Sequence, residues 1–214
     1  MALASLCVAQ DKAKLPENYG WEAALQSVAK MTVAEGLEVS LFAAEPMVQN
    51  PTAMDIDAKG RVWITEAANY RKWANPPIRP EGDRVMTLED TDGDGRADKA
   101  TVFYQDPSVD SALGIAVIGD EVIVSVAPNV FVLRDIDGDG KADQRRLLLT
   151  GTAGRQHDHS FHSFVHGTDG RLYFNFGNTG SHFRNPTGKL LNIPLHGPIS
   201  LDDVKDNSEP ITDL

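Results

Sequence analysis

An acidic loop of nine residues occurs twice in this chain, and every acidic position of the second copy lies 45 residues after its counterpart in the first. Residues 90–98 read Asp-Thr-Asp-Gly-Asp-Gly-Arg-Ala-Asp, and residues 135–143 read Asp-Ile-Asp-Gly-Asp-Gly-Lys-Ala-Asp. When the same acidic loop recurs at a constant offset, the chain is expected to repeat a structural unit of about that length. The loops therefore constrain the architecture as well as the chemistry.

The composition of both loops favours calcium. Aspartates at positions 1, 3, 5 and 9 bring hard oxygens to one point, the glycine at position 6 permits a sharp bend, and the backbone carbonyl at position 7 can turn inward. An EF-hand would need a glutamate at position 12, where Thr101 and Arg146 stand. The alternative is a tight Gly-Asp-Gly turn with solvated acids. The predicted ligands are Asp90, Asp92, Asp94, Asp98, Asp135, Asp137, Asp139 and Asp143, with the carbonyls of Arg96 and Lys141.

After a helical stretch at 16–35, the hydrophobic pattern changes to a period of two and keeps it. Short alternating runs predict strands at 38–43, 53–57, 62–66, 84–89, 101–104, 113–118, 121–126, 130–134, 145–149, 163–166 and 171–176. Three times, a strand, a tight turn and a second strand follow one another, beginning at Met54, Ile115 and Phe164. Units at a pitch of about 45 to 60 residues are typical of a β-propeller, whereas a β-sandwich does not predict a decoration repeated at that pitch.

We therefore expect an all-β fold: a short N-terminal helix followed by about three four-stranded blades of a six-bladed β-propeller that is truncated in this chain. Such a set of blades leaves two blade faces exposed unless missing sequence or a partner covers them. The expected domains are a signal-peptide remnant or disordered terminus at 1–10, a helical leader at 11–35 and a partial propeller at 36–214.

The acidic composition excludes several classes of partner. A net charge of −11 and a pI near 4.9 argue against nucleic acid and anionic membrane. No apolar run approaches the ~20 residues that a membrane span needs. Cys7 is the single cysteine, so the chain has no internal disulfide and no Cys-x-x-Cys-His haem site. The small, apolar N-terminus and the calcium loops favour export, to the periplasm or as a secreted protein.

Four of the six histidines lie within 157–166, directly before and inside the third pair of strands. A loop that leads into the innermost strand of a propeller blade faces the central channel, where ligands commonly bind. The cluster has three interpretations: a general base that abstracts a hydroxyl proton, a transition-metal site made from the His-x-His pair, or a polar loop without chemistry.

Two segments carry a resemblance to known proteins: Gly-Leu-Glu-Val-Ser-Leu-Phe-Ala-Ala-Glu-Pro at 36–46 and Asn-Pro-Thr-Ala-Met-Asp-Ile-Asp-Ala-Lys-Gly-Arg-Val-Trp-Ile-Thr-Glu at 50–66. They resemble the opening of the soluble quinoprotein sugar dehydrogenases. The chain is more similar still to the propeller domains described as membrane-bound dehydrogenases in large secreted proteins of planctomycetes and verrucomicrobia. The first acidic loop followed by Thr-Val-Phe is typical of that second group, and the resemblance covers roughly residues 36–182.

The resemblance implies roles for four residues, and a fifth candidate, His162, comes from the histidine cluster. The histidine eight residues before the Gly-Thr-Asp-Gly turn matches the family's base and is His159; His162 is a second candidate in the same cluster. Asn178 stands where the family has an acid that orients this histidine, and an amide stabilises an imidazolium less well than a carboxylate does. Glu66 and Arg71 match a rim segment, where a structural ion pair is as consistent as a functional role. The residues that grip pyrroloquinoline quinone (PQQ) in the family belong to later blades.

Two functions follow as expectations. The resemblance implies oxidation of a sugar or alcohol hydroxyl, in which His159 takes the proton, PQQ accepts hydride, and electrons leave to a cytochrome c domain outside this chain. The alternative is a non-catalytic, calcium-stabilised propeller that binds glycan or protein partners through the rim residues Tyr70, Trp73 and His182. Asn178 favours the alternative, and the histidine cluster favours the enzyme.

Overall fold

The computed structural model describes residues 19–71, 76–151, 159–176, 181–185 and 187–193. Its first sheet, blade 1, consists of β1 (Pro51–Ile56), β2 (Val62–Glu66), β3 (Arg84–Glu89) and β4 (Lys99–Gln105), each antiparallel to the next. Blade 2 repeats this order with β5 (Gly114–Ile118), β6 (Glu121–Val126), β7 (Asn129–Arg134) and β8 (Gln144–Thr150). The prediction of an all-β propeller fold built from four-stranded antiparallel units is therefore confirmed.

A third unit begins with β9 (Phe161–His166) and β10 (Leu172–Phe176), which form a two-stranded sheet. The next strands, β11 (Ser181–Arg184) and β12 (Leu190–Ile193), pair with each other, and β11 joins the outer edge of blade 2 through the pairing of Arg184 with Thr150. In the described part of the chain, the expected third blade thus has only its first two strands, and blade 2 belongs to a six-stranded sheet.

The N-terminal region differs from expectation. The helical stretch is shorter than predicted, because α1 covers Trp21–Val28 and has no buried residue. The strand predicted at 38–43 is wrong for this structure: an alternating pattern needs a neighbouring strand to form a ladder, and none of the described sheets includes this segment. No helix in the described ranges has both the length and the apolar character to cross a bilayer.

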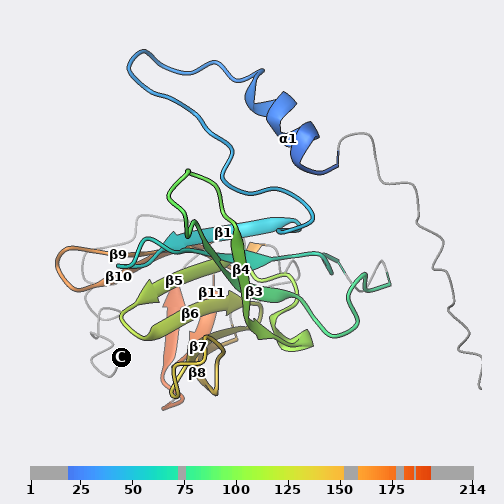
Figure 1. Cartoon of the computed structure of the whole chain (residues 1–214). Coiled ribbons are helices and arrows are strands. Elements are labelled where there is room, and N and C mark those ends of the chain that lie inside the picture. The colour runs from blue at the N-terminus through green and yellow to red at the C-terminus, as the bar shows by residue number, and fades with distance from the viewer. Residues whose placement is uncertain (1–18, 72–75, 152–158, 177–180, 186, 194–214) are drawn as a thin grey trace, which may run out of the picture.

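The blades stack through their faces, and their first strands are neighbours, because β5 lies beside both β1 and β9 (Figure 1). Between blades 1 and 2, the ring of Trp63 meets the ring of Phe103 edge-on, with centroids 4.8 Å apart. The residues buried in this interface also include Val85, Val109, Ala112, Ile115, Val122, Val124, Val126, Phe131 and Leu133. A second cluster joins blade 2 to the third unit: Ala116, Ile123, Val130, Val132, Leu148, Leu149, Phe161 and Phe164.

Gly114 permits close stacking of β5 on β9. A Cβ at this position would lie 2.9 Å from Ser125 Oγ and 3.1 Å from Cδ2 of Phe164, so a larger residue would push the third unit away from blade 2. The Ser125 hydroxyl lies in the same place and donates a hydrogen bond to the Phe161 carbonyl at 3.0 Å. The contact between these units is therefore both apolar and directional.

Each end of the stack exposes apolar side chains. Along β1, Ala53 packs toward blade 2, whereas Met54 and Ile56 point the other way and are 61% and 56% exposed. At the opposite end, Val165 and Tyr173 pair across β9 and β10 and are 60% and 51% exposed. This pattern agrees with the expectation that two blade faces are exposed.

Candidate calcium loops and buried carboxylates

The two acidic loops occupy equivalent places, since residues 90–98 connect β3 to β4 and residues 135–143 connect β7 to β8. Their internal hydrogen bonds also match. Asp90 accepts from the N–H groups of Gly93 (2.7 Å) and Gly95 (2.8 Å). Asp135 accepts from Gly138 (2.7 Å) and Gly140 (2.9 Å) in the same way. The repeat in the sequence is therefore a repeat in backbone geometry.

Each loop gathers three carboxylates whose oxygens lie within 4.8 Å of one another. In the first loop these belong to Asp90, Asp92 and Asp94, and in the second to Asp135, Asp137 and Asp143. The N–H of Gly95, then those of Gly93 and Asp94, hold the pKa of Asp90 below its usual range, so this carboxylate is a ready anionic ligand. A donor set made only of oxygens suits calcium better than a transition metal.

The remaining predicted loop residues take supporting positions. Asp98 accepts from the Thr91 hydroxyl at 2.7 Å, which ties the end of the first loop to its beginning. In the second loop, Asp139 accepts from the N–H of Lys141 at 2.8 Å. Arg96 places its guanidinium over the ring of Trp21 in α1, 5.2 Å from the centroid. The first loop thus contacts the N-terminal segment as well as its own blade.

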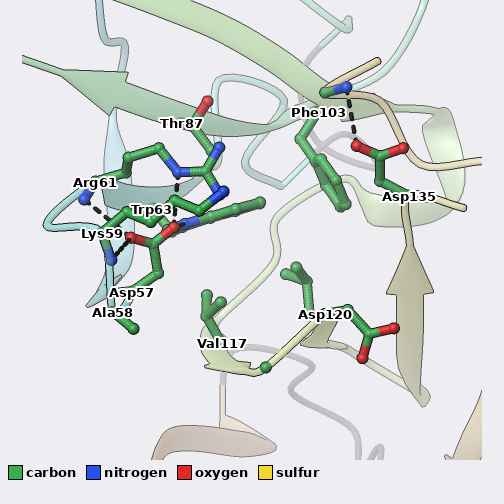
Figure 2. A pocket seen from close by; sticks show the side chains of 13 residues that line it. Asp57, Ala58, Lys59, Arg61, Trp63, Thr87, Phe103, Val117, Asp120 and Asp135 are labelled. Carbon is green, nitrogen blue, oxygen red and sulfur yellow. Dashed lines mark hydrogen bonds and ion pairs between the residues drawn. The ribbon is translucent and has the colours of Figure 1, made fainter. Parts of the chain in front are cut away.

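A cleft of about 240 Å³ lies beside the second loop, between the β1–β2 turn and the β5–β6 turn (Figure 2). Its apolar wall includes Trp63, Phe103 and Val117, and Asp135 of the second loop lies at its edge. On the other side, the buried carboxylate of Asp57 accepts from the Trp63 indole N–H (2.9 Å) and from Arg61 Nε (2.7 Å). Burial alone would raise the pKa of Asp57, but these donors outweigh it and lower the pKa.

Glu66 is fully buried at the end of β2 and forms the centre of an ion-pair cluster. Arg84 donates to both of its oxygens (2.6 and 2.7 Å), and Arg79 donates to Oε2 (2.7 Å). The backbone N–H of Gln49 also donates to Glu66, at 2.7 Å. A buried carboxylate with two guanidinium partners and a backbone donor serves a structural role. Through the N–H of Gln49, it fixes the segment before β1 to blade 1.

Arg71, which the resemblance assigns with Glu66 to the same rim segment, has a left-handed backbone with φ of 56°. Its guanidinium lies 5.1 Å from the centroid of the Tyr70 ring, and Tyr70 is 39% exposed. The rim residue Trp73 falls outside the described residues. This part of the rim therefore presents an exposed aromatic ring with a cation over it.

Asp83 forms a second buried anchor. Its carboxylate accepts from the N–H groups of Asn69 (3.1 and 3.2 Å) and Ser111 (2.9 Å), and Asp110 accepts from the N–H of Asp83 at 2.8 Å. Burial raises the pKa of Asp83, although the N–H groups of Ser111 and Asn69 oppose this effect. The neighbouring Gly82 lies directly against the backbone of Asp106. Its φ is 102°, and a Cβ at this position would lie 2.1 Å from the Asp106 carbonyl carbon, so only glycine fits here.

The predicted catalytic residues lie on different units. His159 lies two residues before the start of β9 and His162 is on β9, whose neighbour is β5, whereas Glu66 ends β2 in blade 1. Both histidine side chains are partly exposed. Asn178 and the histidine at 157 fall outside the described residues, and the side chain of His182 is not described. The structure thus places the candidate base at the start of an inner strand.

Sequence patterns did not identify Arg79, Arg84 and Asp83. The two arginines follow Glu66 by 13 and 18 residues in sequence, so no local motif links them to it. Asp83 precedes β3 in a loop whose acids look solvated in the sequence. The one available signal was the Thr-Glu at the end of β2, where a charged residue follows an apolar run.

Solved structures share this architecture at low sequence identity. Two structures of a Trichoderma reesei protein of the Carbohydrate-Active Enzymes Family AA12, a calcium structure and an iodide structure, both give a TM-score of 0.50 at 17% identity. They cover 67% and 73% of this chain, and 33% and 36% of their own. The PQQ domain of a pyranose dehydrogenase from Coprinopsis cinerea, in its holo form, gives a TM-score of 0.43 at 17% identity over 64% of this chain and 27% of its own.

The chain thus spans about a third of the length of the solved structures that it resembles. No curated protein matches it. One protein family matches residues 23–197, which include blade 1, blade 2, both acidic loops and the strands of the third unit. That match covers most of the sequence, and the chain therefore belongs to the family described as a domain of unknown function, DUF7133.

Proposed function

We propose that this chain is a calcium-binding part of a β-propeller, with one calcium ion in each acidic loop. The observation that carries the proposal occurs twice: three carboxylates have oxygens within 4.8 Å of one another, in loops at the same place in two successive blades. The acids at positions 1 and 3 belong to both clusters, and the third is the acid at position 5 in the first loop and at position 9 in the second. Carboxylates at such distances repel one another unless a cation lies between them. Asp90, Asp92 and Asp94 would hold the first ion, and Asp135, Asp137 and Asp143 the second.

Isothermal titration with calcium tests this proposal. We expect two sites in the wild-type chain and one site in each of Asp90→Asn and Asp135→Asn, because each variant removes the carboxylate at position 1 of one loop. Asp169→Asn is the matched control, since Asp169 is an acid in a turn outside both loops. A wild-type chain that takes up no calcium would contradict the proposal, as would loss of both sites in the control.

For the activity, we propose the oxidation of a sugar or alcohol hydroxyl by an exported protein. Support comes from the resemblance to quinoprotein dehydrogenases and from structural similarity to a carbohydrate-active enzyme family. His159 is the proposed base: it lies in the loop that leads into β9, and a loop at this place in a propeller would face a substrate in the central channel. His162, Asn178, Glu66 and Arg71 remain candidate site residues, with a cytochrome c domain outside this chain as the proposed electron acceptor.

PQQ would supply the hydride acceptor in this activity. The described residues do not include a set that forms a seat for this cofactor, so we derive no hydride step. We expect that PQQ added to the calcium-loaded protein shifts its absorbance, and that His159→Ala abolishes sugar or alcohol oxidation while His166→Ala, at the far end of β9, retains it. Full oxidation activity in His159→Ala would show that another group is the base.

The exposed Tyr70 with Arg71 over its ring favours a second function, a non-catalytic propeller that binds glycans. Aromatic faces with an adjacent cation are common contacts in binding sites. Under this function, Tyr70→Ala weakens binding on a glycan array, and no PQQ response occurs. Unchanged binding in Tyr70→Ala would exclude this surface as the glycan contact.

A further inference from the structure

The two acidic loops make the same contact with a different part of the chain. In the first loop, the N–H of Ala97 donates to the carbonyl of Phe42 at 2.8 Å, and in the second, the N–H of Ala142 donates to the carbonyl of Phe103 at 2.8 Å. Both alanines hold position 8 of their loop. The second contact crosses between blades, because Ala142 belongs to blade 2 and Phe103 lies on β4, the outer strand of blade 1.

The segment that carries Phe42 repeats the one that carries Phe103. Residues 40–50 read Ser-Leu-Phe-Ala-Ala-Glu-Pro-Met-Val-Gln-Asn, and residues 101–111 read Thr-Val-Phe-Tyr-Gln-Asp-Pro-Ser-Val-Asp-Ser, at an offset of 61. Val48 and Val109 at matching positions are both buried. The last residues of the two segments, Asn50 and Ser111, both have a left-handed backbone, with φ of 51° and 61°. The two segments are therefore structural equivalents.

This equivalence gives residues 38–48 a defined place. Val48, Phe42 and Met47 pack on the face of blade 1 opposite blade 2, against Ile64 and Met86. Polar contacts hold the segment at both ends: Ala97 donates to Phe42 at its beginning, and at its end Gln49 donates to Glu66 through its N–H and accepts from Arg79 through its side chain. It thus covers blade 1 as the outer strand of a preceding blade would, without forming a ladder of its own.

We propose that the first acidic loop is a calcium-dependent clasp that fastens residues 42–49 to blade 1, as the second loop fastens blade 2 to β4. Ala97 lies between the acids at positions 5 and 9 of its loop, so fixing that loop around an ion also fixes the direction of its N–H toward Phe42. The same argument joins Ala142 to Phe103. This inference rests on the proposed calcium binding and adds that each ion controls one particular docking contact.

Hydrogen–deuterium exchange on the whole chain, with calcium alone as the added ligand, tests the clasp. The informative amides are those of Met47, Val48 and Gln49, which lie outside the loop. Met47 and Val48 donate to the Ala44 carbonyl within the segment, in a turn that docking holds in place, and Gln49 donates to Glu66 of blade 1. In the wild type, calcium slows their exchange on the order of tenfold, the effect of about one hydrogen bond. In Asp90→Asn this slowing disappears, whereas the matched variant Asp135→Asn retains it.

A second variant guards against misfolding of the first. Ala97→Pro removes the N–H that contacts Phe42 and leaves every carboxylate in place, so titration should still give two calcium sites while amides 47–49 no longer respond to calcium. Ala142→Pro is its counterpart in the second loop. Two calcium sites in the wild type, together with an unchanged response of amides 47–49 in both Asp90→Asn and Ala97→Pro, would overturn the clasp and leave calcium binding intact. A wild-type chain without calcium sites would overturn both.

Discussion

The two faces of blade 1 are covered to different extents. The face toward blade 2 carries Trp63, Val85 and Phe103 and packs against a complete neighbouring blade. The opposite face carries Ile64, Met86 and Leu88, and within the described residues it is the segment at 42–48 that packs on it from outside the blade. As a result, Met54 and Ile56 of the same face stay exposed. A blade is therefore stabilised most where another whole blade lies against it, which follows from the additive, nearest-neighbour character of repeat folds.

The largest expected effect comes from the covered face. Phe103→Ala removes an aromatic ring that is 4% exposed and packs edge-on against Trp63, so we expect a loss of about 3–5 kcal/mol in the free energy of unfolding. Urea denaturation measures this loss. Phe103→Leu, which keeps most of the volume, serves as the control. A loss below about 1 kcal/mol in Phe103→Ala would mean that the two blades do not depend on each other for stability.

On the less covered face, the anchor at Glu66 should matter most. Glu66→Gln keeps the shape but leaves Arg79 and Arg84 without their buried counter-charge, and we expect a loss of about 2–4 kcal/mol, less than for a fully buried pair because both arginines are partly exposed. Thermal unfolding followed by circular dichroism checks it. Lys99→Gln, which removes an exposed ion pair with Glu89, should change stability by less than about 1 kcal/mol.

The pH dependence distinguishes two carboxylates, Asp57, which holds the β1–β2 turn, and Asp83, which holds the segments around Asn69 and Ser111. The pKa of Asp57 is lowered in the fold, so its contribution to stability is present above its unfolded pKa of about 3.8 and is lost as the pH falls through the folded value. The pKa of Asp83 is raised by burial, so ionisation opposes folding, and stability falls as the pH rises from about 3.8 through the folded value.

Unfolding free energies of Asp57→Asn and Asp83→Asn between pH 3 and 7 test these signs. Relative to wild type, the deficit of Asp57→Asn should shrink as the pH falls, whereas that of Asp83→Asn should grow. Parallel curves for both variants would mean that neither carboxylate titrates differently in the folded and unfolded states.

The smallest effect is expected at the exposed end of the stack. Met54→Thr should change the free energy of unfolding by no more than about 0.5 kcal/mol, because Met54 is 61% exposed and has little packing to lose. Chemical denaturation of the purified chain measures it, with Ala53→Thr, on the covered side of the same strand, as the comparison. A large loss in Met54→Thr would mean that this face is covered in solution.

Much of the fold could be predicted from alternation. The bounds of β2, β3 and β6 agree with the predicted runs, because each is a short, largely apolar strand, buried along nearly its whole length, between clear turns. The pattern at 38–43 misled, since the same alternation arises in a segment that only covers a blade face. Strands β11 and β12 were missed because four residues are too few to establish a period.

The candidate sites divide in the same way. The acidic loops could be found because all their carboxylates lie within nine residues, so spacing alone encodes the geometry. The anchors at Glu66 and Asp83 could not, because their partners are distant in sequence. Arg79 and Arg84 reach Glu66 from the β2–β3 loop and the start of β3, and Ser111 reaches Asp83 from the segment between blades 1 and 2. The neighbours of His159 could not be predicted either, because they are set by how strands distant in sequence pack together, and local sequence does not encode that packing.

The consecutive order of strands within each blade has a kinetic consequence. In blade 1 and in blade 2, each strand pairs with the next one along the chain. The hydrogen bonds between these strands therefore join residues that are close in sequence. Contacts between blades join residues much further apart, such as the N–H of Val117 and the carboxylate of Asp55, 62 positions away. Closing longer loops is slower and costs more entropy, so hairpins should form first and blades should dock afterwards, one onto the next.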